Sequence, residues 1–222
     1  MKKIICFVKT PGFSPLKTRL AKSIGQQMAE EFYVRSLSVI KQTMLRLQKV
    51  GYTPVFAVAE KEALDSKLWQ GFQVLWQGEG SLGDRLSHVY AKEFCFGDEV
   101  FFIGGDCPQF TESDLIEASK GLKSNSFVLG PTEDGGYWLF GGKEEVSEQI
   151  WTNVEYSVDS TFSQFKTLLL AKAPVVEIKK YSDVDFGEDL IHLYRHLSET
   201  QELCQTKLDF KEWLSGPVGL LE

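Results

Sequence analysis

Short apolar runs rich in β-branched and aromatic residues alternate with longer helix-like stretches along most of this chain. Their length and composition are typical of buried strands. Because strands that alternate with helices pack as a sheet covered by helices, the pattern predicts an α/β fold. The predicted strands are 4–8, 54–58, 72–76, 100–104, 126–130, 137–140 and 175–178. The predicted helices are 18–49 with a break near Gly25, 82–95, 111–122, 159–172 and 187–198.

The 222 residues fit one hydrophobic core. We expect a single domain over 1–200 and a C-terminal tail over 201–222, where Gly216, Pro217 and Gly219 interrupt the pattern. The apolar run 4–8 is closed by Lys9, and no apolar run approaches the roughly 20 residues of a membrane span. These features and four widely spaced cysteines predict a cytoplasmic protein with reduced thiols. The sequence does not fix the oligomeric state, and a homodimer is compatible with it.

The charge distribution is uneven. The net charge is −7, which argues against nucleic acid as a partner because binding to a phosphate backbone needs many cations on one face. Residues 1–50 nevertheless hold 10 Lys and Arg against only Glu30 and Glu31. Lys9, Lys17 and Arg19 flank a loop rich in Pro and Gly, which can aim cations at an anion. Lys17 and Arg19 at a helix start, with Thr18 as its cap, suit a polyphosphate ligand.

Polar, turn-forming segments follow five of the predicted strands. Ligands of open α/β sheets bind beyond the carboxyl ends of the strands, so these segments should converge on one rim. Asp106 follows the strand 100–104 directly, in a position from which sheets often hold Mg²⁺. Thr111 and Asp114 form a capping-box pattern for the next helix, which leaves Asp106 for another role. Asp183 and Asp185 are two residues apart, so in an extended segment both side chains face one way, and either one could complete a metal site beside Asp106.

Two glycine-containing segments have both a structural and a functional interpretation. Asp134-Gly-Gly-Tyr137 is compatible with a simple hairpin, but its glycines also permit close approach of a substrate, with Tyr137 or Trp138 stacked on a ring. The segment Gly78–Gly83 is a literal G-x-G-x-x-G, which indicates dinucleotide binding as an alternative. Two neighbouring carboxylates, Glu79 and Asp84, disfavour that alternative. Arg85 instead could reach the rim as a substrate clamp.

The chain resembles a bacterial glycosyltransferase-like family of unknown function, the radical-SAM/selenodomain-associated transferases of the nucleotide-diphospho-sugar transferase superfamily. The resemblance rests on several motifs in one order, together spanning roughly 3–155. A later segment, Asp183-Val-Asp-Phe-Gly-Glu-Asp-Leu190, is similar to the D-x-D-T-P-E-D-L close of related nucleotidyltransferases, with Phe186 and Gly187 replacing Thr and Pro. The motifs are Lys9-x-Pro11 with Lys17-Thr-Arg-Leu20, Gln77-Gly-Glu-Gly-x-Leu-Gly-Asp-Arg85, Ile103-Gly-Gly-Asp-Cys-Pro108 and Leu129-Gly-Pro-x-Glu-Asp-Gly-Gly-Tyr137.

This resemblance implies a Rossmann-like three-layer α/β/α sandwich of the glycosyltransferase A type, with a mostly parallel mixed sheet. It implies Mg²⁺ or Mn²⁺ on Asp106 and Asp185, and a catalytic set of Asp106, Lys17 and Arg19. Nucleotide and phosphate would lie against Lys9, Pro11, Lys17, Arg19, Gly104 and Gly105. Substrate or acceptor would lie against Gly78, Arg85, Asp134, Gly135, Gly136 and Tyr137.

These observations together predict a metal-dependent transferase that uses a nucleotide or nucleotide sugar and an unknown acceptor. Glycosyl and nucleotidyl transfer both remain open. The alternatives are an NAD(P)-binding oxidoreductase that uses the 78–83 glycine motif, and a catalytically silent nucleotide-binding module. One departure from the family pattern is Ser14, where the family usually has glycine; phosphate binding would be altered if that position needs a positive φ.

Overall fold

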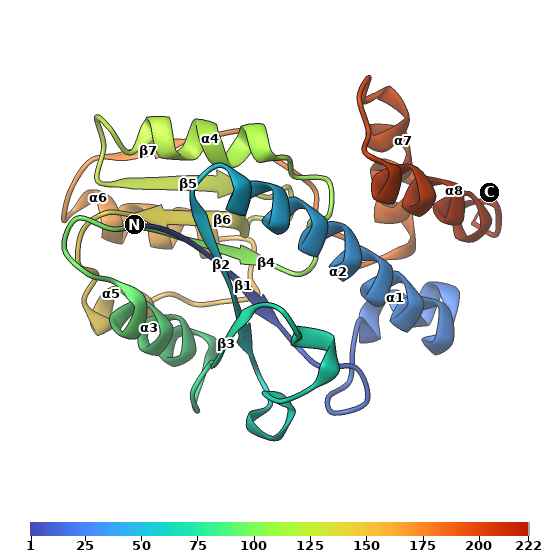
Figure 1. Ribbon diagram of the computed structural model, residues 1–222, viewed down its shortest axis with the longest axis horizontal. Coiled ribbons are helices and arrows are strands. Elements are labelled where there is room, and N and C mark those ends of the chain that lie inside the picture. The colour runs from blue at the N-terminus through green and yellow to red at the C-terminus, as the bar shows by residue number, and fades with distance from the viewer. Residues whose placement is uncertain (222) are drawn as a thin grey trace.

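A computed structural model describes residues 1–221 and contains one seven-stranded sheet (Figure 1). The strand order is β3-β2-β1-β4-β6-β5-β7. Strand β6 runs antiparallel to β4 and β5, and the other neighbouring pairs are parallel. All seven predicted strands are present, each with ends within two residues of the prediction. They are β1 (Lys2–Val8), β2 (Tyr52–Val58), β3 (Gln73–Trp76), β4 (Glu99–Gly104), β5 (Phe127–Pro131), β6 (Tyr137–Gly142) and β7 (Val175–Glu177).

Helices cover both faces of the sheet. Alternate residues of β1 point to opposite faces, so Ile4 and Cys6 enter one hydrophobic cluster and Ile5 enters the other. The first cluster is covered by α2 and α4, and the second by α3, α5 and α6 (Figure 1). The predicted three-layer sandwich with a mostly parallel mixed sheet is therefore confirmed. The helices are α1 (Thr18–Ile24), α2 (Gln26–Lys49), α3 (Leu82–Glu93), α4 (Glu112–Gly121), α5 (Glu148–Thr152), α6 (Thr161–Leu170), α7 (Gly187–Glu199) and α8 (Gln205–Gly219).

Local signals in the sequence account for several helix boundaries. The predicted break near Gly25 separates α1 from α2, and Gly25 has a φ of 83°, a conformation that glycine adopts readily. The capping-box prediction at α4 is also confirmed, because Asp114 accepts hydrogen bonds from both the backbone N–H and the hydroxyl of Thr111. The helix predicted over 159–172 is present as α6 but is two residues shorter at each end. The short helix α5 and the two 3₁₀ turns η1 (Lys61–Ala63) and η2 (Lys67–Trp69) were not predicted from the sequence.

The region 201–222, expected as a tail, contains the 15-residue helix α8. Its buried residues Phe210, Leu214 and Val218 join a third hydrophobic cluster with residues of α1, α2 and α7. The pattern is weak because Gly216 and Pro217 lie within the helix, and Pro217 is itself buried. The division of the chain at residue 200 stays a prediction.

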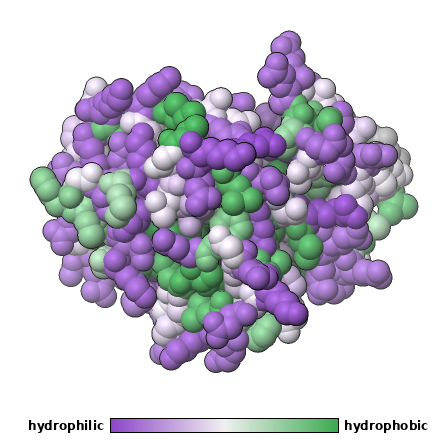
Figure 2. All heavy atoms as spheres, in the orientation of Figure 1, coloured by the Kyte–Doolittle hydropathy of each residue, from purple (hydrophilic) through white to green (hydrophobic). Residues whose placement is uncertain are grey.

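Hydrophilic side chains cover most of the face shown in Figure 2, and the hydrophobic ones form separate patches. Among residues 1–221, none of the helices combines the length and the apolarity needed to cross a bilayer.

If α8 is an integral part of the fold, Leu214→Ala should lower the free energy of unfolding by about 2–5 kcal/mol, because it leaves a cavity at a fully buried position. Urea denaturation measures this difference. Leu208→Ala on the same helix is the matched control, since Leu208 is 39% exposed and should change the free energy of unfolding by less than about 1 kcal/mol. Equal effects of the two substitutions would contradict the packing of α8.

Candidate nucleotide and acceptor site

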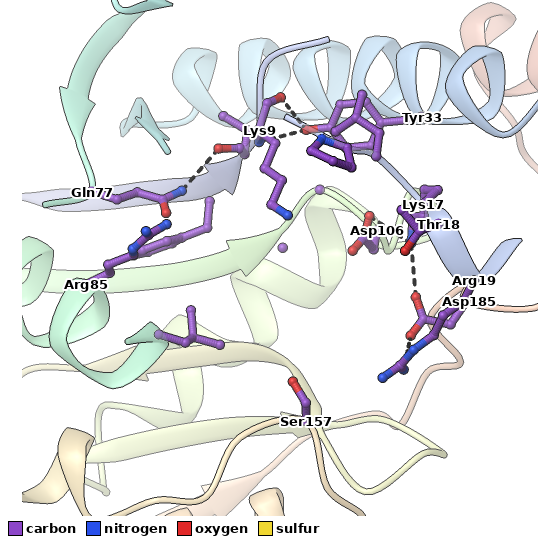
Figure 3. A pocket seen from close by; sticks show the side chains of 17 residues that line it. Lys9, Lys17, Thr18, Arg19, Tyr33, Gln77, Arg85, Asp106, Ser157 and Asp185 are labelled. Atoms are coloured by element: carbon purple, nitrogen blue, oxygen red, sulfur yellow. Dashed lines mark hydrogen bonds and ion pairs between the residues drawn. The ribbon is translucent and has the colours of Figure 1, made fainter. Parts of the chain in front are cut away.

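A cavity of about 560 Å³ opens at the carboxyl ends of β1 and β4. Its position is the one that ligands take in open α/β sheets. Four cationic side chains line it, and Figure 3 shows the ammonium of Lys9 pointing into the space between Gln77 and Arg85 on one side and Asp106 and Lys17 on the other. The cationic residues are Lys9, Lys17, Arg19 and Arg85. Such a cavity is large enough for a nucleotide-sized molecule.

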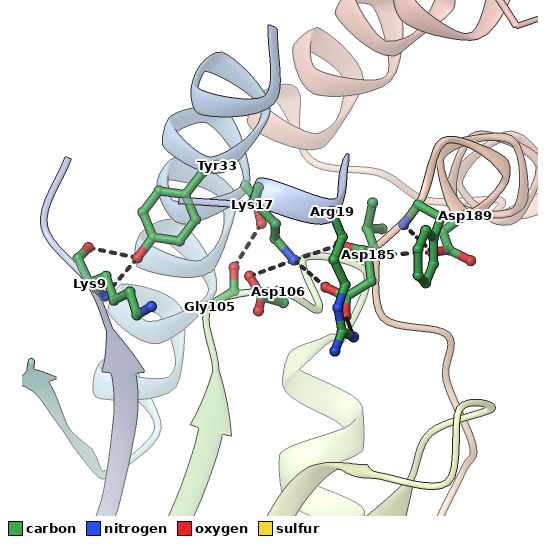
Figure 4. Close-up of polar contacts among 11 residues, drawn as sticks. Lys9, Lys17, Arg19, Tyr33, Gly105, Asp106, Asp185 and Asp189 are labelled. Atoms are coloured by element: carbon green, nitrogen blue, oxygen red, sulfur yellow. Dashed lines mark hydrogen bonds and ion pairs between the residues drawn. The ribbon is translucent and has the colours of Figure 1, made fainter. Parts of the chain in front are cut away.

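Lys17 is the most buried of these cations, with 5% of its side chain exposed. Its Nζ lies 2.9 Å from Oδ1 of Asp106 and 3.5 Å from Oδ1 of Asp185, and it donates to the carbonyl oxygen of Val184 at 2.5 Å (Figure 4). Burial alone would lower the pKa of Lys17, but the nearby carboxylates Asp106 and Asp185 more than offset it and raise the pKa above its ordinary value. Lys17 is therefore a permanently charged group inside the site.

The backbone is strained at two residues that line this cavity. Within residues 1–221, Lys17 (φ 46°) and Ser157 (φ 65°) are the two non-glycine residues with a positive φ. Such conformations are costly for residues with a side chain, and they cluster at functional sites. The loop before α1 takes its other positive φ at Gly12 and has none at Ser14, so the departure from the family pattern at Ser14 imposes no strain.

The start of α1 differs from the prediction. Thr18 was expected as the cap, but it is the first helical residue, and the capping position is Lys17 without a side-chain hydrogen bond. The helix begins one residue earlier than a cap at Thr18 implies because the left-handed backbone of Lys17 turns the chain directly into it. Because α1 has only seven residues, side-chain charge rather than the helix dipole would have to hold a phosphate here.

Arg19 and Asp185 form an ion pair at the edge of the cavity. The guanidinium Nη1 lies 2.9 Å from Oδ2 of Asp185, and the Arg19 side chain is 54% exposed (Figure 4). Asp189 accepts hydrogen bonds from the backbone N–H groups of Asp185 and Phe186, at 2.9 and 2.7 Å. Asp189 thus caps α7, which leaves the Asp185 carboxylate free to face Lys17 and Arg19.

The backbone of the loop after β1 is fixed by side chains from other segments. The Tyr33 hydroxyl accepts from the Lys9 N–H at 3.0 Å and donates to the Lys9 carbonyl at 2.7 Å (Figure 3). Glu60 accepts from the Thr10 N–H at 2.8 Å. Since both anchors act on the backbone, they hold the loop in place while the Lys9 side chain stays available to a ligand.

A second cavity of about 220 Å³ adjoins the first. Four residues line both cavities: Phe7, Leu82, Gly104 and Ser157. The second cavity has mainly aromatic and aliphatic walls, and two carboxylates, Asp134 and Asp183, line it as well. The pKa of Asp183 is raised to about 6, first by burial and then by the negative charges of Asp134 and Asp185. Burial also raises the pKa of the phenols of Tyr137 and Tyr156, which stay neutral.

Most of the predicted site residues lie in one of these two cavities. Lys9, Lys17, Arg19, Gly104, Gly105, Asp106 and Asp185 line the first. Arg85, expected beside the acceptor, lines the first cavity too, and its Nε donates to the Gly80 carbonyl at 3.2 Å. Asp134, Gly136 and Tyr137 line the second. Asp183 and Asp185, expected on one side of an extended segment, separate, because Asp183 lines the second cavity and Asp185 the first.

Three predicted residues line neither cavity: Pro11, Gly78 and Gly135. Gly135 has a steric role, since a Cβ there would lie 1.9 Å from the Asp159 carbonyl oxygen. The glycines of the G-x-G-x-x-G segment also meet local demands. Gly78 and Gly80 have positive φ, and a Cβ on Gly83 would lie 2.7 Å from the Trp151 carbonyl oxygen. The segment also follows β3, at the edge of the sheet, rather than the central strand β1.

Three further residues line the first cavity but were not predicted as site residues: Tyr33, Gln77 and Ser157. Gln77 was visible as part of a motif, and its buried side chain donates to the carbonyls of Val8 and Ala57 at 3.1 and 2.9 Å. Tyr33 and Ser157 carry no local signal, because one lies within a long helix and the other in an irregular segment.

The fold is that of the nucleotide-diphospho-sugar transferases. A candidate nucleotide-diphospho-sugar transferase from Desulfovibrio desulfuricans G20 matches with a TM-score of 0.85 at 22% identity, over 98% of this chain and 96% of that one. The 4-diphosphocytidyl-2C-methyl-D-erythritol synthase of Anaerococcus prevotii matches with a TM-score of 0.57 at 12% identity, over 89% and 98%. A CMP:2-keto-3-deoxy-manno-octonic acid synthetase, solved with CTP, matches with a TM-score of 0.52 at 14% identity, over 91% and 99%. At these identities the likeness concerns the fold alone.

The chain belongs to the DUF2064 family, described as an uncharacterized protein conserved in bacteria, whose pattern matches residues 37–158. The expected membership in a bacterial family of unknown function is thereby confirmed, and the fold of the chain is the one that the resemblance implied. Comparison with curated proteins gives no significant match.

The raised pKa of Asp183 makes stability depend on pH. Because the folded state binds this proton more tightly than the unfolded state, wild type should lose stability relative to Asp183→Asn as pH rises from 3.8 to about 6. Across this pH range, the free energy of unfolding of wild type should fall by on the order of 2 kcal/mol relative to that of Asp183→Asn. Urea denaturation at pH 4 to 7 in the presence of a chelator measures it.

Ser182→Ala is the control for this experiment, since it alters a neighbouring residue without an ionisable group. Its effect on the free energy of unfolding should not change with pH. A pH-independent difference for Asp183→Asn as well would contradict the assigned environment of Asp183.

Proposed function

We propose that this protein is a transferase that uses a nucleoside triphosphate or a nucleotide sugar, bound in the first cavity. The observation that carries the proposal is the convergence of Lys9, Lys17, Arg19 and Arg85 on that cavity. A protein with a net charge of −7 has no general reason to gather four cations at one point. The pyrophosphate of a nucleotide needs such a set of donors. The names of the structural neighbours, a nucleotide-diphospho-sugar transferase and two enzymes of cytidine nucleotides, support the same class of ligand.

The chemistry of the proposed reaction is electrostatic. The acceptor forms a bond to the transferred nucleotidyl or glycosyl group and releases a proton to water, and the bond to the pyrophosphate or nucleoside diphosphate breaks. That leaving group takes the electron pair of the broken bond, so negative charge builds up on its oxygens. Lys17 and Arg19 are held in place by Asp106 and Asp185 before any ligand arrives, and preorganised cations stabilise such charge without reorganising.

A divalent cation, Mg²⁺ or Mn²⁺, is part of the proposal. The Oδ1 atoms of Asp106 and Asp185 lie 2.9 and 3.5 Å from the ammonium of Lys17, and Oδ2 of Asp106 has no ion-pair partner within residues 1–221. No group of three or more His, Cys, Asp or Glu side chains in residues 1–221 is arranged to hold a metal. Mg²⁺ commonly takes only one or two carboxylates and completes its shell with substrate phosphates and water, so this donor set fits. When bound, the metal would neutralise phosphate charge as a Lewis acid.

Nucleotide binding should depend on Lys17. For wild type, a nucleoside triphosphate or nucleotide sugar at 100 times its dissociation constant should stabilise the fold by about 2.7 kcal/mol, which a thermal-shift assay detects. Lys17→Met removes the buried cation and should abolish this shift. Comparison of triphosphates, diphosphates and nucleotide sugars shows which donor class the site prefers.

The matched control is Lys22→Met, which removes an exposed cation of the same helix that does not line the cavity. It should keep the wild-type shift. The proposal fails if no nucleotide stabilises wild type, or if both variants respond as wild type does.

Metal dependence should reside in Asp106. With wild type, the nucleotide-induced thermal shift should be larger with Mg²⁺ or Mn²⁺ than with a chelator, because metal and protein neutralise the phosphates together. Asp106→Asn keeps the shape of the side chain but removes its charge, so the shifts with metal and with chelator should become equal.

Asp209→Asn, at an exposed carboxylate of α8, serves as the control and should retain the metal dependence. A wild-type shift that is the same with metal and with chelator would remove the metal from the proposed function and leave a nucleotide-binding site that needs none.

A further inference from the structure

The second cavity differs from the first in the sign of its charges. No Lys, Arg or His is among the residues that line it, whereas two carboxylates, Asp134 and Asp183, are. Neither of these two carboxylates forms an ion pair within residues 1–221. Asp134 accepts from the Thr132 hydroxyl at 2.6 Å and from the Gly136 N–H at 3.0 Å, which fixes its position on the turn. A second anion in this cavity would therefore meet two carboxylates that no cation of the described residues pairs with directly.

Apart from these carboxylates, the walls of the second cavity are mainly apolar. Phe7, Leu86, Phe102 and Trp138 line it together with the ring of Tyr137, which stacks on Phe165 with ring centroids 5.2 Å apart. Its volume of about 220 Å³ is below the range of roughly 300–1,000 Å³ typical of sites for drug-sized molecules. The cavity therefore suits a single ring or a short branched chain rather than a second nucleotide.

The two cavities join beside Gly104, at the end of β4. A Cβ at Gly104 would have only the Asp106 N–H nitrogen within 4 Å, at 3.9 Å, so the space next to it is open. Gly104 lines both cavities, as does Ser157 with its strained backbone. A molecule in the second cavity thus lies next to a nucleotide in the first, which is the place an acceptor must take.

We infer that the second cavity binds the acceptor of the proposed transferase, and that this acceptor is a compact molecule with an apolar body and a hydroxyl or amino group, free of phosphate and carboxylate. That the bound molecule is an acceptor rests on the proposed function. That it is compact, apolar and free of anionic groups rests on the charges and walls of the second cavity. A hydroxyl or ammonium group donates to carboxylates, whereas a phosphate or carboxylate is repelled by them.

Four probes with the same ring test the inference: benzyl alcohol, benzylamine, benzoate and phenyl phosphate. Saturation-transfer NMR measures their binding to wild type and to Val158→Phe, which fills the second cavity from its wall. Benzyl alcohol and benzylamine should bind wild type and lose most of their signal in Val158→Phe. Benzoate and phenyl phosphate should give the same signal in both, since any binding would come from the cations of the first cavity.

A second variant makes the test independent of how Val158→Phe folds. The double substitution Asp134→Asn with Asp183→Asn removes both charges and keeps hydrogen-bonding side chains. Benzylamine should bind to this double variant at least fivefold more weakly than to wild type, whereas benzyl alcohol should bind about as well. Benzoate, which should not compete with benzyl alcohol for wild type, should compete with it for the double variant. Asp159→Asn removes a neighbouring exposed carboxylate that does not line the cavity, and it should leave all four probes unchanged.

The inference is overturned if benzoate or phenyl phosphate competes with benzyl alcohol in wild type, or if no probe gives a signal that depends on Val158. These outcomes are separate from failure of the proposed function. Nucleotide binding is measured on the same Val158→Phe protein, and it should persist there because the first cavity is untouched. If wild type binds no nucleotide, the proposed function is wrong, but the result with the four probes still stands.

Discussion

The buried ammonium of Lys17 is the interaction on which the geometry of the site depends. It joins three segments that are distant in sequence: the loop after β1, the end of β4 through Asp106, and the segment before α7 through Val184 and Asp185. A charge with 5% exposure is tolerated only when partners replace the lost water, and here one carbonyl and two carboxylates do so. A single cation thus connects the loop, the strand end and the α7 segment.

Lys17 also has a left-handed backbone conformation, with a φ of 46°. A positive φ is costly for lysine, so the surrounding contacts must hold it there. Glycine would adopt the conformation more readily, but it would supply no ammonium. The strained residue Ser157 lines the same cavity, in a segment from the other side of the sheet. Strain at both places indicates that the chain is shaped around the cavity rather than for stability alone.

The strands and most helices were predictable because their signals are local. Strand composition, the glycine at position 25 and the Thr111–Asp114 cap each act over a few residues. Helix α8 was not predicted because Gly216 and Pro217 weaken its sequence pattern. Its apolar residues are buried by packing against α2 and α7, which the local sequence does not show.

For the site, the order of motifs at the strand ends predicted that Lys9, Lys17, Arg19 and Asp106 lie at one rim of the sheet, and all four line the first cavity. The sequence could not separate Asp183 from Asp185, since their alternation says nothing about which cavity each one enters. The contribution of Tyr33 depends on how α2 packs beside the loop after β1, and it therefore has no local signal.

The division of charge between the two cavities links the fold to the direction of the proposed transfer reaction. Cations gather where β1 and β4 end, and the unpaired carboxylates lie toward β6 and the segment before α7. A nucleotide can therefore bind with its phosphates on the cationic side, and an anionic molecule has no favourable place on the other. Since the carboxylates on that second side also attract donors, an approaching hydroxyl or amine would be oriented with its lone pair away from them, toward the shared wall at Gly104. In the proposed reaction, the acceptor's nucleophilic atom would then lie beside Gly104, which lines both cavities, and would face the group that the bound nucleotide donates.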